Sequence, residues 1–163
     1  MKSKKKVRGI ATGAIIATMY VVLTYITNAL GLANGAIQVR FSEALTILPV
    51  FTPYAIPGVF IGCLISNILT GCVVTDIIFG SLATLIGGIG TYLLRKHPII
   101  ATIPPILANT LIIPFVLVYA YHLEGAMWYF FLTIFIGELI SCGILGTLLH
   151  KSLSKRDIFK SFQ

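Results

Sequence analysis

Long apolar runs with few charges inside them constrain this chain more than any other feature of its sequence. Hydrophobic residues make up 57% of the 163 residues and charged residues only 10%, whereas soluble domains carry roughly 25% charged residues. A membrane-spanning helix needs about 20 predominantly apolar residues, and several runs approach or reach that length. The sequence therefore predicts an all-α integral membrane protein.

We expect a single membrane domain over residues 1–163, because the chain has no room for a second one. The apolar runs and their breaks predict six helices, at about residues 9–30, 41–51, 56–69, 76–94, 99–121 and 126–149. The second and third helices are short, which indicates incomplete or tilted spans around a cavity. Gly31, Asn34 and Gly35 predict a turn or re-entrant loop before the second helix. Thr75 or Asp76 is expected to cap the fourth helix.

Positive charge predicts the topology. With six spans, both chain ends and the loop after the fourth helix lie on one side of the membrane. That side receives 11 of the 12 basic residues, namely Lys2, Lys4, Lys5, Lys6, Arg8, Arg95, Lys96, Lys151, Lys155, Arg156 and Lys160. Basic loops stay in the cytoplasm, so we expect a multi-pass cell-membrane protein with both termini cytoplasmic. Arg40 is the exception, on the outer side.

Small residues recur every four positions on the first helix, at Gly9, Gly13 and Ala17. Such a ridge lets another helix approach closely. Two interpretations stay open, which are packing inside the bundle and docking of a partner protein.

Aromatic residues cluster around the turn before the sixth helix. They are typical of an interfacial belt and comprise Tyr119, Tyr121, His122, Trp128 and Tyr129.

Isolated polar residues within the apolar runs are the candidate binding residues. Arg40 and Glu43 are three residues apart, which places them on one face of a helix. Glu138 lies about twelve residues into a membrane helix, where a carboxylate needs a partner, a proton or a ligand. With the predicted topology these residues, together with Asn67, Asp76 and Asn109, converge on a cavity open to the outside.

Each candidate also has a structural interpretation. Arg40 and Glu43 can form a salt bridge that holds a loop in place. Asp76 can cap a helix, and Asn67 and Asn109 can join neighbouring helices by hydrogen bonds.

Several activities are excluded by missing motifs. All three histidines lie near helix ends, and no His-Glu-x-x-His or phosphate-binding Gly-x-x-x-x-Gly-Lys-Ser/Thr motif is present. Cys63, Cys72 and Cys142 lack metal-type spacing and are expected to be packing residues. We therefore expect no catalytic residue, no metal and no cofactor, and a binding or transport protein without an ATPase of its own.

Five stretches together resemble the QueT family of queuosine-precursor transporters. They are Val39–Thr46 (VRFSEALT), Ala55–Cys63 (AIPGVFIGC), Asp76–Leu85 (DIIFGSLATL), Pro104–Asn109 (PPILAN) and Gly137–Ile140 (GELI). The resemblance runs in order from the first helix to the sixth. No single motif is specific alone, but the combination is.

This resemblance implies a substrate-binding S-component of an energy-coupling factor (ECF) transporter, with six membrane helices and a substrate site near the outer face. It also implies a transmembrane coupling protein and two cytoplasmic ATPases as partners. In such S-components an Ala-x-x-x-Ala pattern on the first helix contacts the coupling protein. Here Gly13 and Ala17 match best, and the glycine departs from the pattern.

The ligand implied by the resemblance is 7-aminomethyl-7-deazaguanine. Its guanine-like edge offers adjacent N–H donors that one carboxylate can accept, and its aminomethyl group is a cation near neutral pH. We assign Glu138 to the guanine edge and Asp76 to the ammonium, with Glu43 as the alternative for either. Arg40, Asn67 or Asn109 would donate to the ring carbonyl.

Two alternatives remain. One is an S-component for another flat nutrient, such as a vitamin or a nucleobase. The other is a structural membrane protein without a ligand, in which Arg40, Glu43 and Glu138 pair with one another and leave no cavity.

Overall fold

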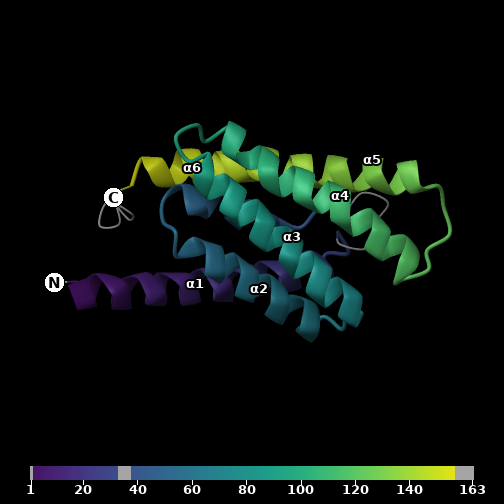
Figure 1. The fold of residues 1–163 in the computed structure, drawn as a ribbon, viewed down its shortest axis with the longest axis horizontal. Helices are drawn as coiled ribbons and strands as arrows, with labels where there is room; N and C mark the ends of the chain where they lie inside the picture. The colour runs from purple at the N-terminus through teal and green to yellow at the C-terminus, as the bar shows by residue number, and fades with distance from the viewer. Residues whose placement is uncertain (1, 33–37, 157–163) are drawn as a thin grey trace.

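The computed structural model describes residues 2–32 and 38–156, which form a bundle of helices (Figure 1). Helix is the only regular secondary structure in those ranges. In order the elements are α1 (Lys2–Ala29), η1 (Phe41–Val50), α2 (Ala55–Leu69), α3 (Val74–Leu93), η2 (Ile100–Thr102), α4 (Ile103–Tyr119), α5 (Met127–Glu138), η3 (Leu139–Leu145) and α6 (Gly146–Ser154). The elements η1 and η2 are 3₁₀-helices and η3 is a π-helix. For this part of the chain the all-α prediction is confirmed.

Four stretches of described helix are long and apolar enough to cross a membrane, at Lys4–Ala29, Val74–Leu93, Ile100–Tyr119 and Met127–Ser154. Many of their large apolar side chains face outward, as Ile78 and Ile86 do on α3. Water-facing surfaces rarely expose so much contiguous apolar area, whereas lipid favours it. The chain is therefore a multi-pass membrane protein.

The apolar helices η1 and α2 are shorter. At about 2.0 Å per residue the ten residues of η1 extend roughly 20 Å, and at about 1.5 Å per residue the fifteen of α2 extend roughly 22 Å. A bilayer's hydrocarbon core is about 30 Å thick. Neither helix alone reaches across it.

Several helix boundaries differ from the sequence-based expectation. The first helix begins at Lys2 rather than near residue 9, because lysines are good helix formers and extend the helix beyond its apolar run. The expected helix at 41–51 is a 3₁₀-helix with Pro49 inside it. The last helix is continuous to Ser154, with the π-helical segment η3 at its centre. Asn34, Gly35 and Lys160 lie outside the described residues.

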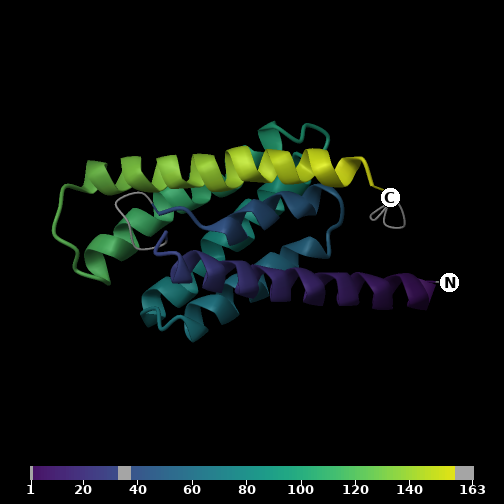
Figure 2. The ribbon, with the colours of Figure 1, turned by 180° about the vertical axis from the view of Figure 1, so that it is seen from behind.

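The stretch around Arg40 and Glu43 lies at the centre of the bundle. The helix η1 contacts α1, α2, α3, η3 and α6, and every residue from Ser42 to Pro49 is buried. Figure 2 shows η1 between α1 on one side and the continuous α5–α6 helix on the other. A short helix surrounded by longer ones can present polar side chains to the interior of the bundle.

The start of α1 and the end of α6 lie at the same end of the bundle (Figure 1). The connection between α3 and η2, which carries Arg95 and Lys96, is directed toward that end as well. The connections from α2 to α3 and from α4 to α5 lie at the opposite end. Basic side chains of the described residues are therefore gathered near the termini, and Arg40 is apart from them.

The small residues of α1 pack inside the bundle. Gly9, Gly13 and Ala17 are buried, and a Cβ at Gly9 would overlap the ring of Tyr54. A Cβ at Gly58 of α2 would lie 2.7 Å from the carbonyl oxygen of Gly13, closer than real Cβ atoms come. Internal packing therefore accounts for the spacing of these residues, and their contact with a partner stays a prediction.

Candidate functional site

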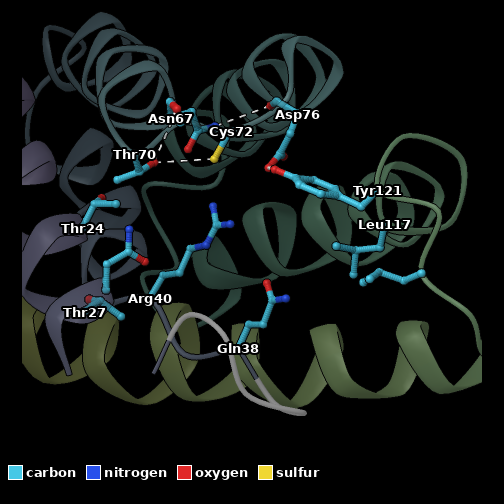
Figure 3. Close-up of a pocket in the computed structure, with 13 residues that line it drawn as sticks. Thr24, Thr27, Gln38, Arg40, Asn67, Thr70, Cys72, Asp76, Leu117 and Tyr121 are labelled. Carbon is cyan, nitrogen blue, oxygen red and sulfur yellow. Dashed lines mark hydrogen bonds between the residues drawn. The ribbon is translucent and has the colours of Figure 1, made fainter. Parts of the chain in front are cut away.

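A cavity of about 370 Å³ lies at the end of the bundle away from the termini. Its volume is within the roughly 300–1,000 Å³ typical of small-molecule sites. Most of its lining is polar and comes from α1, α2, α3, the segment before η1 and the loop after α4 (Figure 3). The lining residues are Thr24, Thr27, Asn28, Gln38, Arg40, Asn67, Thr70, Gly71, Cys72, Asp76, Leu117, Tyr121 and Leu123.

Arg40 enters this cavity from an extended segment fixed on both sides. Its backbone has φ −114° and ψ 111°, and its N–H donates to Ser141 Oγ in η3 at 3.1 Å. The next N–H, of Phe41, donates to Thr27 Oγ1 of α1 at 3.2 Å. The segment is therefore held between α1 and η3, and the arginine side chain has a fixed origin.

Gly137 provides the space for this segment. A Cβ at Gly137 would overlap the carbonyl oxygen of Gln38 and lie 3.0 Å from its carbonyl carbon. Glycine is therefore required where α5 passes the Gln38 peptide, because any side chain would displace the backbone that carries Arg40.

The guanidinium of Arg40 has no hydrogen bond and no ion pair within 4.0 Å to any described residue. Figure 3 shows it projecting into the cavity, with Asn67, Cys72 and Asp76 on the facing wall. The salt bridge between Arg40 and Glu43 that the structural interpretation requires is therefore absent from the described residues. A half-buried guanidinium whose five donors have no partner in residues 2–32 and 38–156 is suited to bind an acceptor on a ligand.

Asp76 is buried, with 4% of its surface exposed, and borders the cavity. The expectation that it caps the fourth helix is wrong, because the N-cap of α3 is Val73 and Asp76 lies inside the first turn. Its Oδ2 accepts a hydrogen bond from the hydroxyl of Tyr121 at 2.9 Å, and its Oδ1 has no partner. One carboxylate oxygen is thus fixed and the other is available.

Tyr121 was expected in the interfacial aromatic belt, but its hydroxyl faces Asp76 (Figure 3). Burial, and next the charge of Asp76, raise the pKa of Tyr121 above its ordinary value near 10. The hydroxyl therefore keeps its proton and donates at neutral pH.

Asn67 is buried on α2, beside Asp76. Its Nδ2 donates to the backbone carbonyl of Asp76 at 3.5 Å and lies 3.7 Å from Cys63 Sγ. Both contacts are long. Asn67 therefore joins α2 to α3 as the structural interpretation expected, and it also lines the cavity.

Glu43 and Glu138 lie deeper, behind the cavity. They are 2% and 8% exposed. The hydroxyl of Tyr20 donates to Glu43 Oε1, and Cys142 Sγ donates to Glu138 Oε2 at 3.1 Å. The oxygens of the two glutamates and the sulfur of Cys142 come within 4.8 Å of one another. Cys142 was expected to be a packing residue, and in the structure it also donates a hydrogen bond to a candidate site residue.

Four buried side-chain atoms of the described residues have no hydrogen-bond partner, and three belong to expected site residues. These are Glu43 Oε2, Asp76 Oδ1 and Asn109 Nδ2; the fourth is Thr110 Oγ1. Buried polar atoms are nearly always paired, and leaving one unpaired costs about 1–3 kcal/mol. Their unpaired atoms make Glu43, Asp76 and Asn109 the candidate contacts of a bound molecule.

The six expected residues thus divide into two groups. Arg40, Asn67 and Asp76 line the open cavity, whereas Glu43, Asn109 and Glu138 lie together beneath it. Arg40 borders both. Sequence reasoning missed the cavity residues Gln38 and Tyr121 and the buried Tyr20. Gln38, two positions before Arg40, was the one with a usable signal, since a strand-like segment places both on one face.

These observations define a class: a multi-pass membrane protein with a polar cavity at one end of a helical bundle. The model of the QueT transporter family matches residues 10–155. A relative described as "Queuosine precursor transporter QueT", from Lactococcus lactis subsp. cremoris (strain MG1363), is 42% identical over 63 residues. That alignment covers 39% of this chain and 37% of the relative, so it spans little more than a third of either protein. No solved structure matches.

The chain belongs to the QueT transporter family, because the family model matches most of its length. Membership in a transporter family implies a small-molecule substrate and a membrane setting, and it favours transport over catalysis. The cavity bordered by Arg40 and Asp76 is the candidate place for that substrate.

Proposed function

We propose that this protein is the substrate-binding S-component of an ECF-type importer and captures 7-aminomethyl-7-deazaguanine from outside the cell. The observation that carries the proposal is a set of buried polar atoms at Glu43, Asp76 and Asn109 that have no partner among the described residues. The guanidinium of Arg40 beside them has none there either. The proposed ligand is a planar ring with N–H donors on one edge, a carbonyl acceptor and a cationic substituent. The donors and the cation suit the carboxylates, and the carbonyl suits the guanidinium or the asparagine amide.

The charges of the site support a cationic ligand. Three of the chain's five acidic residues, Glu43, Asp76 and Glu138, line the cavity or the space beneath it, together with one of twelve basic residues. Carboxylates lining a low-dielectric cleft attract cations and repel anions. A substrate with an ammonium group fits this balance better than an uncharged nucleobase does.

The proposed topology has six spans and cytoplasmic termini. Its support is the position of the basic side chains, because Lys4, Lys5, Lys6, Arg8, Arg95, Lys96, Lys151, Lys155 and Arg156 gather at the end of the bundle where both termini lie. In this orientation the cavity faces outward. The helices η1 and α2 would be the two short spans, and both pack against the longer helices α1 and α3.

The proposed partners are a transmembrane coupling protein and two cytoplasmic ATPases. A groove of about 610 Å³ along α1 and α2 supports a docking face there, since Gly9, Gly13 and Ala17 line it together with exposed apolar neighbours. Reconstitution tests this part: ATP-dependent uptake into vesicles should require this chain, the coupling protein and the ATPases together. Uptake by this chain alone would contradict it.

Equilibrium binding tests the substrate assignment. We expect 7-aminomethyl-7-deazaguanine to bind the purified wild-type chain, and Asp76→Asn to weaken binding at least tenfold, because a hydrogen bond to a charged group contributes about 1.5–3 kcal/mol. Glu124→Gln is the matched control, since Glu124 is an exposed acidic residue that lines neither space. Equal weakening by both substitutions would remove Asp76 from the site.

A ligand-free structural protein is the less favoured alternative. It requires Arg40, Glu43 and Glu138 to pair and leave no cavity. These residues form no ion pair within 4.0 Å among the described residues, and Arg40 borders a cavity of about 370 Å³. An S-component for a different flat nutrient remains the alternative that ligand competition decides.

A further inference from the structure

A second, much smaller space lies beneath the cavity. Its volume is about 10 Å³, which is close to the minimum that holds one water molecule. It is surrounded by Gln38, Arg40, Glu43, Cys63, Gly80, Thr84, Asn109, Ile113, Ile134 and Glu138. A group of one heavy atom fits there, and a purine-like ring does not.

Two carboxylates converge on this space. Glu43 Oε2 has no partner although Glu43 is 2% exposed, and Glu138 is held by a hydrogen bond from Cys142. Two carboxylates this close in a membrane interior repel each other unless a proton or a cation lies between them. Arg40 borders the space without pairing to either one within 4.0 Å.

Asn109 gives an independent indication of a ligand. It lies on α4, is 4% exposed, and its Nδ2 has no hydrogen-bond partner. The amide of an asparagine can present its oxygen or its nitrogen to the same place by a half-turn of the side chain. In the structure the unpartnered atom is the Nδ2 donor; with the amide turned, its oxygen would be a third acceptor for a donor placed in this space.

The small space adjoins the cavity above it. Gln38 and Arg40 line both. Gly80 lines the small space, and a Cβ there would lie 3.1 Å from Asp76 Oδ1 and 3.2 Å from Asn67 Nδ2, which are groups of the cavity wall. The absence of a side chain at Gly80 leaves room between the cavity wall and the small space, where a short substituent on a ligand would extend.

We infer that the small space is a subsite for a primary ammonium group on the substrate, with Glu43 and Glu138 as its acceptors. The inference rests on the proposed function and assigns its groups: the flat ring stays in the cavity, where Asp76 Oδ1 accepts from the ring edge, and the ammonium extends inward. This reverses the assignment drawn from the sequence, because the ring is too large for the space beside Glu138.

Three ligands separate this subsite from the rest of the site. They are 7-aminomethyl-7-deazaguanine, 7-cyano-7-deazaguanine, which keeps a substituent but lacks the charge, and 7-deazaguanine, which has no substituent. Removing one member of a buried charge pair costs at least about 30-fold in affinity. We therefore expect wild type to bind the amine at least about 30-fold more tightly than either analogue.

The variants Glu43→Gln and Glu138→Gln should remove that preference, because they weaken binding of the amine at least about 30-fold more than binding of either analogue. Asp76→Asn should weaken all three ligands alike, and Glu124→Gln should weaken none. Because Glu43 also accepts from Tyr20, its variant can lose stability. If the Glu43 variant is unstable, the Glu138→Gln variant and the comparison of the three ligands on wild type test the subsite.

Each other outcome overturns the inference. If Glu43→Gln and Glu138→Gln weaken the three ligands equally, or if Asp76→Asn alone removes the preference for the amine, the ammonium does not occupy the small space, while the proposed function stands. If amine binding requires added Na⁺ or Zn²⁺, an inorganic ion occupies it instead. If none of the three ligands binds wild type, the proposed function itself fails.

Discussion

Replacing Gly137 with alanine tests how the fold positions Arg40. A Cβ at this position would overlap the carbonyl oxygen of Gln38 and lie 3.0 Å from its carbonyl carbon and 3.5 Å from its nitrogen. The Gln38 peptide must then retreat by on the order of 1 Å to reach ordinary contact distances. Because backbone atoms rather than a flexible side chain are in the way, relaxation requires the whole segment before η1 to move.

The magnitude follows from two opposing effects. Overpacking costs about 1–3 kcal/mol, and a backbone clash belongs at the upper end of that range. Alanine also gains about 0.5–1 kcal/mol over glycine inside a helix. We therefore expect a net loss of about 2 kcal/mol in the free energy of unfolding, which is about 30-fold in the ratio of folded to unfolded protein.

Ligand affinity should fall together with stability. The displaced segment carries Gln38 and Arg40, and loss of one hydrogen bond from a charged group costs about 1.5–3 kcal/mol. At least tenfold weaker binding of 7-aminomethyl-7-deazaguanine is therefore expected. The assays are thermal unfolding in detergent and equilibrium binding on the same preparation.

Gly143→Ala is the matched control on the same continuous helix. A Cβ there would meet Leu139 Cδ1 at 3.4 Å and Ile106 Cδ1 at 3.8 Å, which are ordinary contacts with side chains. It should leave affinity unchanged and stability equal or slightly higher. If Gly137→Ala matched Gly143→Ala in both assays, the reasoning that Gly137 sets the position of Arg40 would be refuted.

Three further predictions concern the cavity wall. Tyr121→Phe should weaken ligand binding at least about tenfold, because the Asp76 carboxylate loses a charge-assisted hydrogen bond of about 1.5–3 kcal/mol; unchanged affinity measured by titration would contradict it. Because the pKa of Tyr121 is raised in the folded protein, its contribution to stability is complete below pH 10 and is lost as the pH rises above that value. The melting temperature should therefore fall more in wild type than in Tyr121→Phe between pH 9 and about pH 11; an equal fall in both proteins would contradict this. Cys72 is partly exposed and borders the cavity, whereas Cys63 and Cys142 are buried. Mass spectrometry should therefore detect maleimide on Cys72 alone, and bound ligand should slow the labelling; the same labelling rate with and without ligand would count against the site.

The sequence predicted the membrane class and most helices because apolar runs report burial in lipid directly. It also provided the candidate site residues, since a charge such as Glu138 in an apolar run is costly and needs a partner or a ligand; their role in binding stays a prediction. Among the six expected site residues, three carry polar atoms that are buried and unpartnered. The family resemblance is confirmed by the match over residues 10–155.

The division of the site into a cavity and a deeper space could not be predicted in this way. It depends on how far Arg40 projects from an extended segment, which is set by Ser141, Thr27 and Gly137 on distant parts of the chain. The π-helical segment η3, which holds Ser141 and Cys142, has no signature in the apolar pattern. π-helical turns occur frequently at functional sites, and this one supports both Arg40 and Glu138.

Tyr121 shows a second limit of sequence reasoning. Its position in an aromatic cluster at a helix end is typical of a membrane interface, and its neighbours Tyr119 and Trp128 are indeed 70% and 68% exposed. The turn after α4 directs Tyr121 alone toward Asp76. Which member of an aromatic cluster faces inward depends on backbone direction in the loop, and composition carries no information about it.

The most direct test of the central claim is equilibrium binding of 7-aminomethyl-7-deazaguanine to the purified chain, with guanine, riboflavin and thiamine as competitors. The account predicts tight binding that none of the three competitors displaces at equal concentration. Displacement by a vitamin or by guanine with higher affinity would keep the cavity and replace the substrate. Absence of binding by all four compounds would contradict the claim that Arg40, Asp76 and the carboxylates beneath them form a substrate site.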